Sequence, residues 1–208
     1  MSPTTDNKDD TAIRKSGYHH GDLRAGLIAA TRQLVEENGP DGFSVSDACR
    51  LAGVSTAAPY KHFKNKGEML VAVCVESMGR LKANMETAVA EIPEGDPLRL
   101  KAIGGEYVNF ALTEPACFRL KFGGFTDGMD DSQLKAAGEQ VFETAMREVA
   151  ACIGESEITP RVRQRAFMLW SFVHGLSFIL YDKDLADMGE GVDMEFMLAD
   201  MARRVLSD

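Results

Sequence analysis

The chain has 208 residues, of which 45% are hydrophobic, a size and composition that suit one large or two small globular domains. No stretch reaches the roughly 18 uninterrupted apolar residues of a membrane span, so we expect a soluble, cytoplasmic protein without a membrane partner. The net charge of -9 is unevenly distributed, since residues 12–70 carry eight basic and six acidic side chains, whereas residues 71–208 carry 14 and 23. The acidic balance therefore does not exclude a nucleic-acid partner for the first third of the chain.

Cysteine and histidine spacing indicates no metal or cofactor site. The four cysteines are widely separated, without a CxxC pair or a neighbouring histidine, so neither a zinc site nor a disulfide framework is indicated. Adjacent His19 and His20 point in different directions and have no third ligand at useful spacing. We interpret the cysteines as small apolar core residues, with a redox-sensing thiol as the alternative. They are Cys49, Cys74, Cys117 and Cys152.

The chain begins with a polar segment, residues 1–17, that we expect to be a flexible arm. Its Arg14 and Lys15 either remain solvated or reach phosphates or a minor groove. Apolar residues then recur at helical spacing from Leu23 to Leu34, and Asn38-Gly39-Pro40 supplies a stop signal. These signals predict a helix from about Asp22 to Asn38.

Residues 43–66, FSVSDACRLAGVSTAAPYKHFKNK, contain the signals of two short helices joined by a turn. Ser44 and Asp47 have the spacing of a capping box, and Gly53 permits a sharp turn. Thr56 is a suitable cap for a second helix, Ala57 to Phe63, which would place Pro59 in the tolerant first turn. This pattern predicts a helix-turn-helix that presents its second helix to a DNA major groove.

The residues of the second helix fall into two groups, small side chains and longer side chains with hydrogen-bond donors. The small Thr56, Ala57 and Ala58 allow close approach to base edges, where their methyl groups can meet a thymine methyl. The longer Tyr60, Lys61 and His62 carry donors that suit phosphates. Phe63 is interpreted as a core residue. The candidate DNA-binding residues are Ser44, Ser55, Thr56, Ala57, Ala58, Tyr60, Lys61, His62 and Lys66.

Four segments in this region, Tyr18–Arg24, Ala52–Ser55, Ala58–Phe63 and Lys66, together resemble the DNA-binding domain of the tetracycline-repressor (TetR) family of bacterial regulators. The resemblance implies that Tyr60, His62 and Lys66 contact the DNA backbone, with Ser44 and Thr56 at helix starts near phosphates. Further along, Trp170–Gly175 resembles the Trp-His-Gly signature of one subgroup's C-terminal domain.

The remainder of the chain shows helical periodicity and no persistent strand pattern, which predicts an all-α protein. Residues 123–131, GGFTDGMDD, should form a loop, and they contain neither GxGxxG nor a P-loop. Thr159-Pro160 combines a cap with a proline at the first helical position. The predicted helices span residues 66–91, 97–112, 115–122, 132–153, 159–181 and 192–206.

Aromatic residues are more abundant after residue 100 than packing of so small a helical domain needs, which predicts a pocket for a small-molecule effector. Core packing is the alternative for each of them, and His174 is either a ligand contact or a structural residue. Asn109 and Arg119 are further polar groups that could orient a ligand. The candidate ligand-binding residues are Tyr107, Phe110, Phe118, Phe122, Phe142, Phe167, Trp170 and His174.

The last two predicted helices are unusually apolar. Residues 167–180 are hydrophobic on nearly every side, and residues 194–205 carry a stripe of Met, Leu and Val, so both helices need covering. The resemblance implies that they form a four-helix bundle with a second copy, and Gly175 would allow close approach there. Burial within one subunit is the alternative. A homodimer would also let two short reading helices bind two half-sites.

These patterns predict three parts: an arm at 1–17, a helix-turn-helix DNA-binding domain at 18–66, and a helical ligand-binding and dimerisation domain at 67–208. The predicted function is that of a transcriptional regulator, a repressor that a ligand releases from a palindromic operator. No motif for catalysis occurs, since no GxSxG or Glu-x-x-His pair is present. The alternative is a helical small-molecule-binding or adaptor protein without DNA-binding activity.

Overall fold

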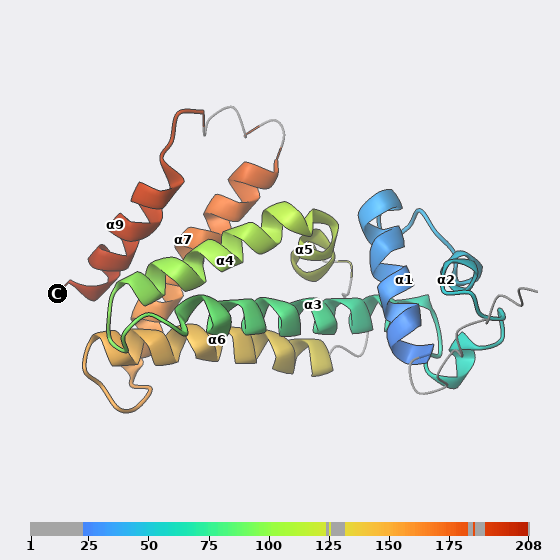
Figure 1. Ribbon diagram of the computed structural model, residues 1–208, viewed down its shortest axis with the longest axis horizontal. Helices are drawn as coiled ribbons and strands as arrows, with labels where there is room; N and C mark the ends of the chain where they lie inside the picture. The colour runs from blue at the N-terminus through green and yellow to red at the C-terminus, as the bar shows by residue number, and fades with distance from the viewer. Residues whose placement is uncertain (1–22, 124, 126–131, 183–184, 186–189, 208) are drawn as a thin grey trace, which may run out of the picture.

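The computed structural model describes residues 23–123, 125, 132–182, 185 and 190–207 (Figure 1). Within these residues every regular element is helical, which confirms the predicted all-α class. The elements are α1 (Leu23–Asn38), α2 (Val45–Leu51), the 3-10 helix η1 (Pro59–Lys61), α3 (Lys66–Val89), α4 (Leu98–Thr113), α5 (Pro115–Phe122), α6 (Ser132–Cys152), α7 (Pro160–Tyr181) and α9 (Met194–Leu206). The boundaries of α1 and of α3 to α9 agree with the sequence-based boundaries to within two residues.

Local caps explain several of these helix starts. Ser44 and Asp47 form the complete capping box at α2, with the Ser44 amide donating to Asp47 Oδ2 at 2.9 Å. Thr159 caps α7 ahead of Pro160, as predicted, and Asp193 caps α9. Each cap accepts a hydrogen bond from an amide that a helix start leaves without an intrahelical partner.

The predicted second helix of the helix-turn-helix, Ala57 to Phe63, was wrong in its extent and cap. The segment forms one turn closed by the Ala58 amide on the Ser55 carbonyl, followed by the single 3-10 turn η1 capped at Ala58. Pro59 causes the interruption, because it has no amide hydrogen and its ring obstructs the carbonyl four residues earlier, which is that of Ser55. The reading segment is therefore a pair of tight turns.

The N-terminal helices pack around a small core at the start of α3. Phe43 and Phe63 are both buried, which confirms the interpretation of Phe63 as a core residue. Gly53 adopts a φ of 69° in the turn after α2, a conformation that glycine adopts without strain. Helix α1 packs against α2, α3 and α5, so it contacts both the helices that flank the reading segment and a helix of the C-terminal part.

The long α3 leaves the N-terminal unit and runs beside α6, with α4 and α5 packed against it as well (Figure 1). Helix α4 packs against α3, α7 and α9. Gly104 permits this approach, since a Cβ there would lie 3.3 Å from Val173 and 3.4 Å from Leu198. The apolar stripe of α9 faces inward, with Leu198 and Val205 buried against its own subunit. That stripe therefore fits the alternative of burial within one subunit.

Some sequence predictions lie outside the described residues. They are the arm at 1–17, His19 and His20, the Tyr18–Asp22 part of the TetR-like motif, and most of the loop at 123–131. Among the helices of the described segments, none combines the length and hydrophobicity needed to cross a bilayer.

Candidate DNA-binding surface and ligand cavity

The segment from Ser55 to His62 presents most of the predicted DNA-binding residues to solvent. Ser55, Thr56 and Ala57 are exposed, and Ala58 is half-buried. Tyr60 is 63% exposed although it is a large aromatic residue, whereas neighbouring Pro59 is buried and anchors the turn. Pro59 therefore fixes the backbone while the exposed side chains remain available to a partner.

The charged groups of this surface differ in availability. Arg50 pairs with Asp47 at 2.6 Å and Lys64 pairs with Glu68 at 3.4 Å. Lys61 has no carboxylate within ion-pair distance among the described residues, and neither does His62. These two side chains, with the Tyr60 hydroxyl, are the donors that the turn leaves free for phosphates.

Two predicted contacts are already engaged inside the domain. The Lys66 ammonium donates to the Phe43 carbonyl oxygen at 2.5 Å and lies 4.2 Å from the centroid of the Phe43 ring. The Ser44 hydroxyl donates to Asp47 at 2.7 Å. This hydrogen bond, the largest cause, together with the backbone bond from Ser44, holds the pKa of Asp47 below its usual value. Ser44 therefore stabilises the start of α2, and Lys66 ties the start of α3 to Phe43.

A cavity of about 440 Å³ opens in the C-terminal helices, between α3, α4, α5, α6 and α7. Five of the predicted ligand-binding residues line it: Tyr107, Phe122, Phe142, Phe167 and Trp170. Its other walls include Met78 and Met85 from α3 and Ile103 from α4. Its volume and apolar walls are typical of a site for a small organic molecule.

The other predicted pocket residues lie elsewhere. Phe118 is completely buried and Phe110 is buried beside it, so both are core residues behind the cavity wall. His174 does not line the cavity. Asn109 and Arg119 are exposed, and Arg119 donates to the Tyr181 hydroxyl at 3.0 Å. Helical spacing groups these residues on faces but cannot show which face meets a void.

His174 instead supports the cavity wall from behind. Its Nδ1 lies 2.7 Å from the Tyr107 hydroxyl oxygen, which also accepts the indole N–H of Trp170 at 3.3 Å. The Trp170 and His174 rings stack with centroids 5.0 Å apart. Burial lowers the pKa of His174, so the imidazole is neutral at pH 7, and its Nδ1 shares a hydrogen bond with the Tyr107 hydroxyl. Burial raises the pKa of Tyr107, which keeps that hydroxyl protonated.

This network predicts a pH-dependent stability. Because the folded-state pKa of His174 lies below the ordinary value of about 6.5, the unfolded chain takes up the proton first on acidification. We expect the His174 contribution to the free energy of unfolding to be lost as the pH falls below about 6.5. His174→Gln, which keeps an acceptor for Tyr107 but does not titrate, should flatten this part of the profile. Urea unfolding from pH 5 to 8 measures the difference, and identical profiles would contradict it.

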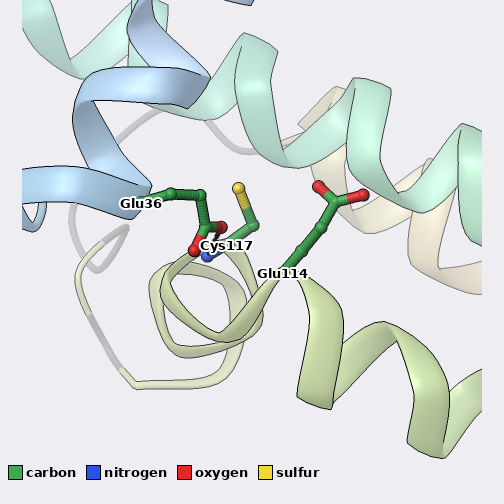
Figure 2. A group of neighbouring side chains, drawn as sticks. All are labelled: Glu36, Glu114 and Cys117. Atoms are coloured by element: carbon green, nitrogen blue, oxygen red, sulfur yellow. Dashed lines mark hydrogen bonds between the residues drawn. The ribbon is translucent and has the colours of Figure 1, made fainter.

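The junction between the N-terminal unit and the C-terminal helices is built on carboxylates (Figure 2). Glu36 at the end of α1 accepts the amide hydrogens of Ala116 at 3.0 Å and Cys117 at 2.9 Å, in the first turn of α5. Glu114 points away from them toward α3, where the Arg80 guanidinium donates to both of its oxygens, at 2.6 and 3.2 Å. A carboxylate at a helix N-terminus is stabilised by the amide hydrogens and the helix dipole.

Glu36, Glu114 and Cys117 lie close enough to suggest a metal site, but their bonding does not suit one. Both Glu36 oxygens accept amide hydrogens, and Glu114 pairs with Arg80. Burial and the neighbouring Glu36 raise the pKa of the Cys117 thiol, so the thiolate that a metal would need is disfavoured. The contacts are those of a junction between helices.

The remaining cysteines also fit the core interpretation. Cys49 and Cys74 are buried, and burial raises the pKa of Cys74 to about 12. Cys152 is half-buried, and burial raises its pKa to about 11. Thiols with raised pKa values are poor nucleophiles at neutral pH, so these data do not favour the redox-sensing alternative.

Comparison with known protein families matches both the N-terminal and the C-terminal part of the chain to family models. Residues 27–73 match the family model described as bacterial regulatory proteins, tetR family, and residues 100–203 match the tetracyclin repressor-like C-terminal domain. The chain therefore belongs to the TetR family of DNA-binding transcriptional regulators. The family resemblance of the sequence is thus confirmed.

Similar solved structures support the same fold over nearly the whole chain. A protein of unknown function from Rhodococcus sp. RHA1 has a TM-score of 0.75 and 29% identity, covering 92% of this chain and 97% of its own. A putative transcriptional regulator from Pseudomonas aeruginosa PAO1 has a TM-score of 0.69 and 18% identity, covering 93% of each chain. The fatty acid degradation regulator FadR from Bacillus halodurans has a TM-score of 0.67 and 15% identity, covering 88% of this chain and 97% of its own.

A curated relative matches a shorter part. The fatty acid metabolism regulator protein of Bacillus subtilis (strain 168) is 34% identical over 65 residues, which is 31% of this chain and 34% of that protein.

Proposed function

We propose that this protein is a repressor that binds a palindromic operator as a homodimer and is released by a largely apolar small molecule. It acts by binding DNA and ligand and not by catalysis, and as a regulator of bacterial genes it works in the cytoplasm. The observation that carries the proposal is one continuous set of helices. The exposed reading turn connects α2, which packs on α1, to the start of α3. Helices α3 and α5, which contact α1, also form walls of the 440 Å³ cavity.

An exposed apolar face on α7 and α9 supports the dimer. Met168, Phe178 and Ile179 are exposed on α7, and Phe196 on α9 is 60% exposed. A Cβ on Gly175 would have no atom of the described residues within 4 Å beyond its own helix backbone and chain neighbours, so this part of α7 is open to close approach. Such a face on the surface of a monomer is typical of a protein interface. Two subunits would place two reading turns on two operator half-sites.

Release requires that the ligand bind two conformations unequally. Met78 and Met85 of α3 line the cavity, and the same helix begins directly after the reading turn, at Lys66, which donates to the Phe43 carbonyl of the N-terminal core. Glu36 contacts the first turn of α5, and Phe122, the last residue of that helix, also lines the cavity. A ligand that shifts α3 or α5 would therefore change how α1 and the reading turn sit relative to the second subunit.

The proposal is tested by titrating the purified protein against DNA upstream of its own gene at several salt concentrations. We expect tight binding to one palindromic segment, a stoichiometry of two chains per segment, and an affinity that falls steeply with salt. Weak binding without sequence preference, both here and in a genome-wide DNA selection, would favour a helical ligand-binding or adaptor protein instead.

We expect the contact between Glu36 and the start of α5 to transmit ligand binding to the DNA-binding helices. Glu36→Gln keeps the side-chain size but presents only one acceptor oxygen and no charge to the amides of Ala116 and Cys117. We expect operator affinity without ligand to change by no more than about threefold, whereas the ligand-induced loss of affinity should shrink by about fivefold or more, the usual range of a coupling energy. Glu37→Gln, which removes the same charge from an exposed neighbouring residue of α1 that accepts from Gln33, is the matched control. A ligand response unchanged in Glu36→Gln would contradict transmission through this junction.

A further inference from the structure

The chemistry of the cavity rim suggests which class of molecule the cavity binds. Among the described residues, its lining includes three charged side chains, Lys121 from α5 and Lys135 and Glu139 from α6. The described part of the rim thus carries a net charge of +1, although residues 71–208 together carry -9. A positive rim on a strongly acidic domain is a local feature that background composition does not explain.

The charged residues lie close together. Lys135 and Gly138 are three residues apart and therefore neighbours on one face of α6. A Cβ on Gly138 would lie 3.8 Å from Lys121 Cε and 3.9 Å from its Nζ, so the Lys121 side chain extends from α5 to α6 beside Gly138. The Lys121 ammonium and the Lys135 side chain therefore border the cavity beside the same stretch of α6.

The two rim lysines also differ from the other described lysines of the C-terminal part. Lys82 pairs with Glu86 and Lys101 pairs with Glu195. Within the described segments, neither Lys121 nor Lys135 has a carboxylate at ion-pair distance, and the Lys121 ammonium lies over the Phe122 ring at 5.6 Å. An ammonium without a carboxylate at the edge of an apolar cavity can bind an anion without first breaking an ion pair.

The inner wall offers little to a charged group. Its polar groups are the Tyr107 hydroxyl and the Trp170 indole N–H, which are bonded to each other, and the hydroxyl is also bonded to His174 Nδ1. The other uncharged lining residues are Met, Ile, Leu, Val, Ala, Gly and Phe. A polar group of a ligand would lose its hydration there without a replacement partner, so it must lie at the rim.

We propose that the ligand of this cavity is an amphipathic anion, whose apolar body fills the inner part and whose carboxylate or similar head group binds Lys121 and Lys135 at the rim. This inference rests on the proposed function and deepens it by naming the ligand class. The two lysines outweigh Glu139, so an anion is favoured over an amine of the same shape. Glu139 weakens the attraction and sets its strength.

The test compares probes that differ only in the head group. Decanoate, decan-1-ol and decylamine, and separately 2-naphthoate and 2-naphthalenemethanol, are titrated below their aggregation concentrations at pH 7.5. Trp170, the only tryptophan of the chain and part of the cavity wall, reports binding by its fluorescence. We expect the anion of at least one series to bind about tenfold more tightly than its alcohol, the effect of one charged hydrogen bond.

Three variants test the origin of this preference. Lys121→Met keeps the aliphatic stem and should reduce the anion-to-alcohol ratio to within about twofold of one, while alcohol affinity stays within about twofold of wild type. Glu139→Gln should raise the ratio. Lys82→Met, the same change at a lysine outside the cavity, should leave it unaltered.

The outcomes separate the two proposals. If alcohols bind as tightly as anions, if decylamine binds most tightly, or if Lys121→Met leaves the ratio unchanged, the anion assignment is overturned but the apolar ligand site stands. If no probe of either series binds, both the ligand class and the ligand-binding part of the proposed function are overturned. Operator binding is tested independently by the DNA titration described above.

Discussion

The double variant Tyr60→Ala and Lys61→Ala is expected to lower operator affinity by at least about 100-fold. Both side chains are exposed on the reading turn, and neither is engaged with the described remainder of the protein. Each hydrogen bond to a charged group contributes about 1.5–3 kcal/mol, and a dimer loses each contact twice. The salt dependence of binding should also become shallower, because fewer phosphates are neutralised. Fluorescence anisotropy with operator DNA at several salt concentrations measures both effects.

Two comparisons make this prediction specific. Lys82→Ala changes a half-buried lysine of α3 outside the reading turn, and should bind DNA as the wild type does. Lys66→Ala removes the hydrogen bond to the Phe43 carbonyl, so it should lower thermal stability together with DNA affinity, whereas the double variant should unfold like the wild type. Operator binding unaffected by the double variant would show that the reading turn is scaffold.

Phe118→Ala is expected to reduce the free energy of unfolding by about 3–5 kcal/mol, the usual cost of removing a fully buried phenylalanine. Phe118 is 0% exposed, and its ring lies 5.0 Å from that of Phe122, 5.2 Å from Phe178 and 5.7 Å from His174. The truncation therefore leaves a void at the centre of the aromatic cluster behind the ligand cavity. Urea denaturation at a fixed protein concentration measures the loss.

The matched control is Phe142→Ala, in a residue that is half-buried and lines the cavity. Its ring borders empty space on one side, so fewer packing contacts are lost, and we expect a cost of less than about 2 kcal/mol. It should instead weaken ligand binding. Equal stability losses in the two variants would contradict the distinction between the core ring and the wall ring.

The secondary structure was largely predictable because its signals are local. Ser44 with Asp47, and Thr159 with Pro160, mark helix starts through hydrogen bonds and backbone angles that involve only neighbouring residues. The reading helix was the exception. Pro59 signalled a helix start, but the sequence did not show that its ring would leave only a 3-10 turn before α3 begins.

The cavity was predictable in kind but not in membership. Aromatic abundance indicated a pocket, yet Phe118 and Phe122 differ although they share one face of α5, because Phe118 is completely buried in the core and Phe122, at the end of the helix, reaches the cavity. The charged rim residues Lys121, Lys135 and Glu139 carried no local signal. Lysine and glutamate are common on solvated helix faces, and only the approach of α5 to α6 gives these three a shared function.

The sequence by itself determined the helical class, most helix boundaries and the family, because caps, periodicity and motif spacing act over a few residues. The tertiary structure alone decided the contact of Glu36 with a helix start 80 residues later, the support of Tyr107 by His174, and the two lysines at the cavity rim. These features join residues that are distant in the chain, and their partners depend on how whole helices pack against one another.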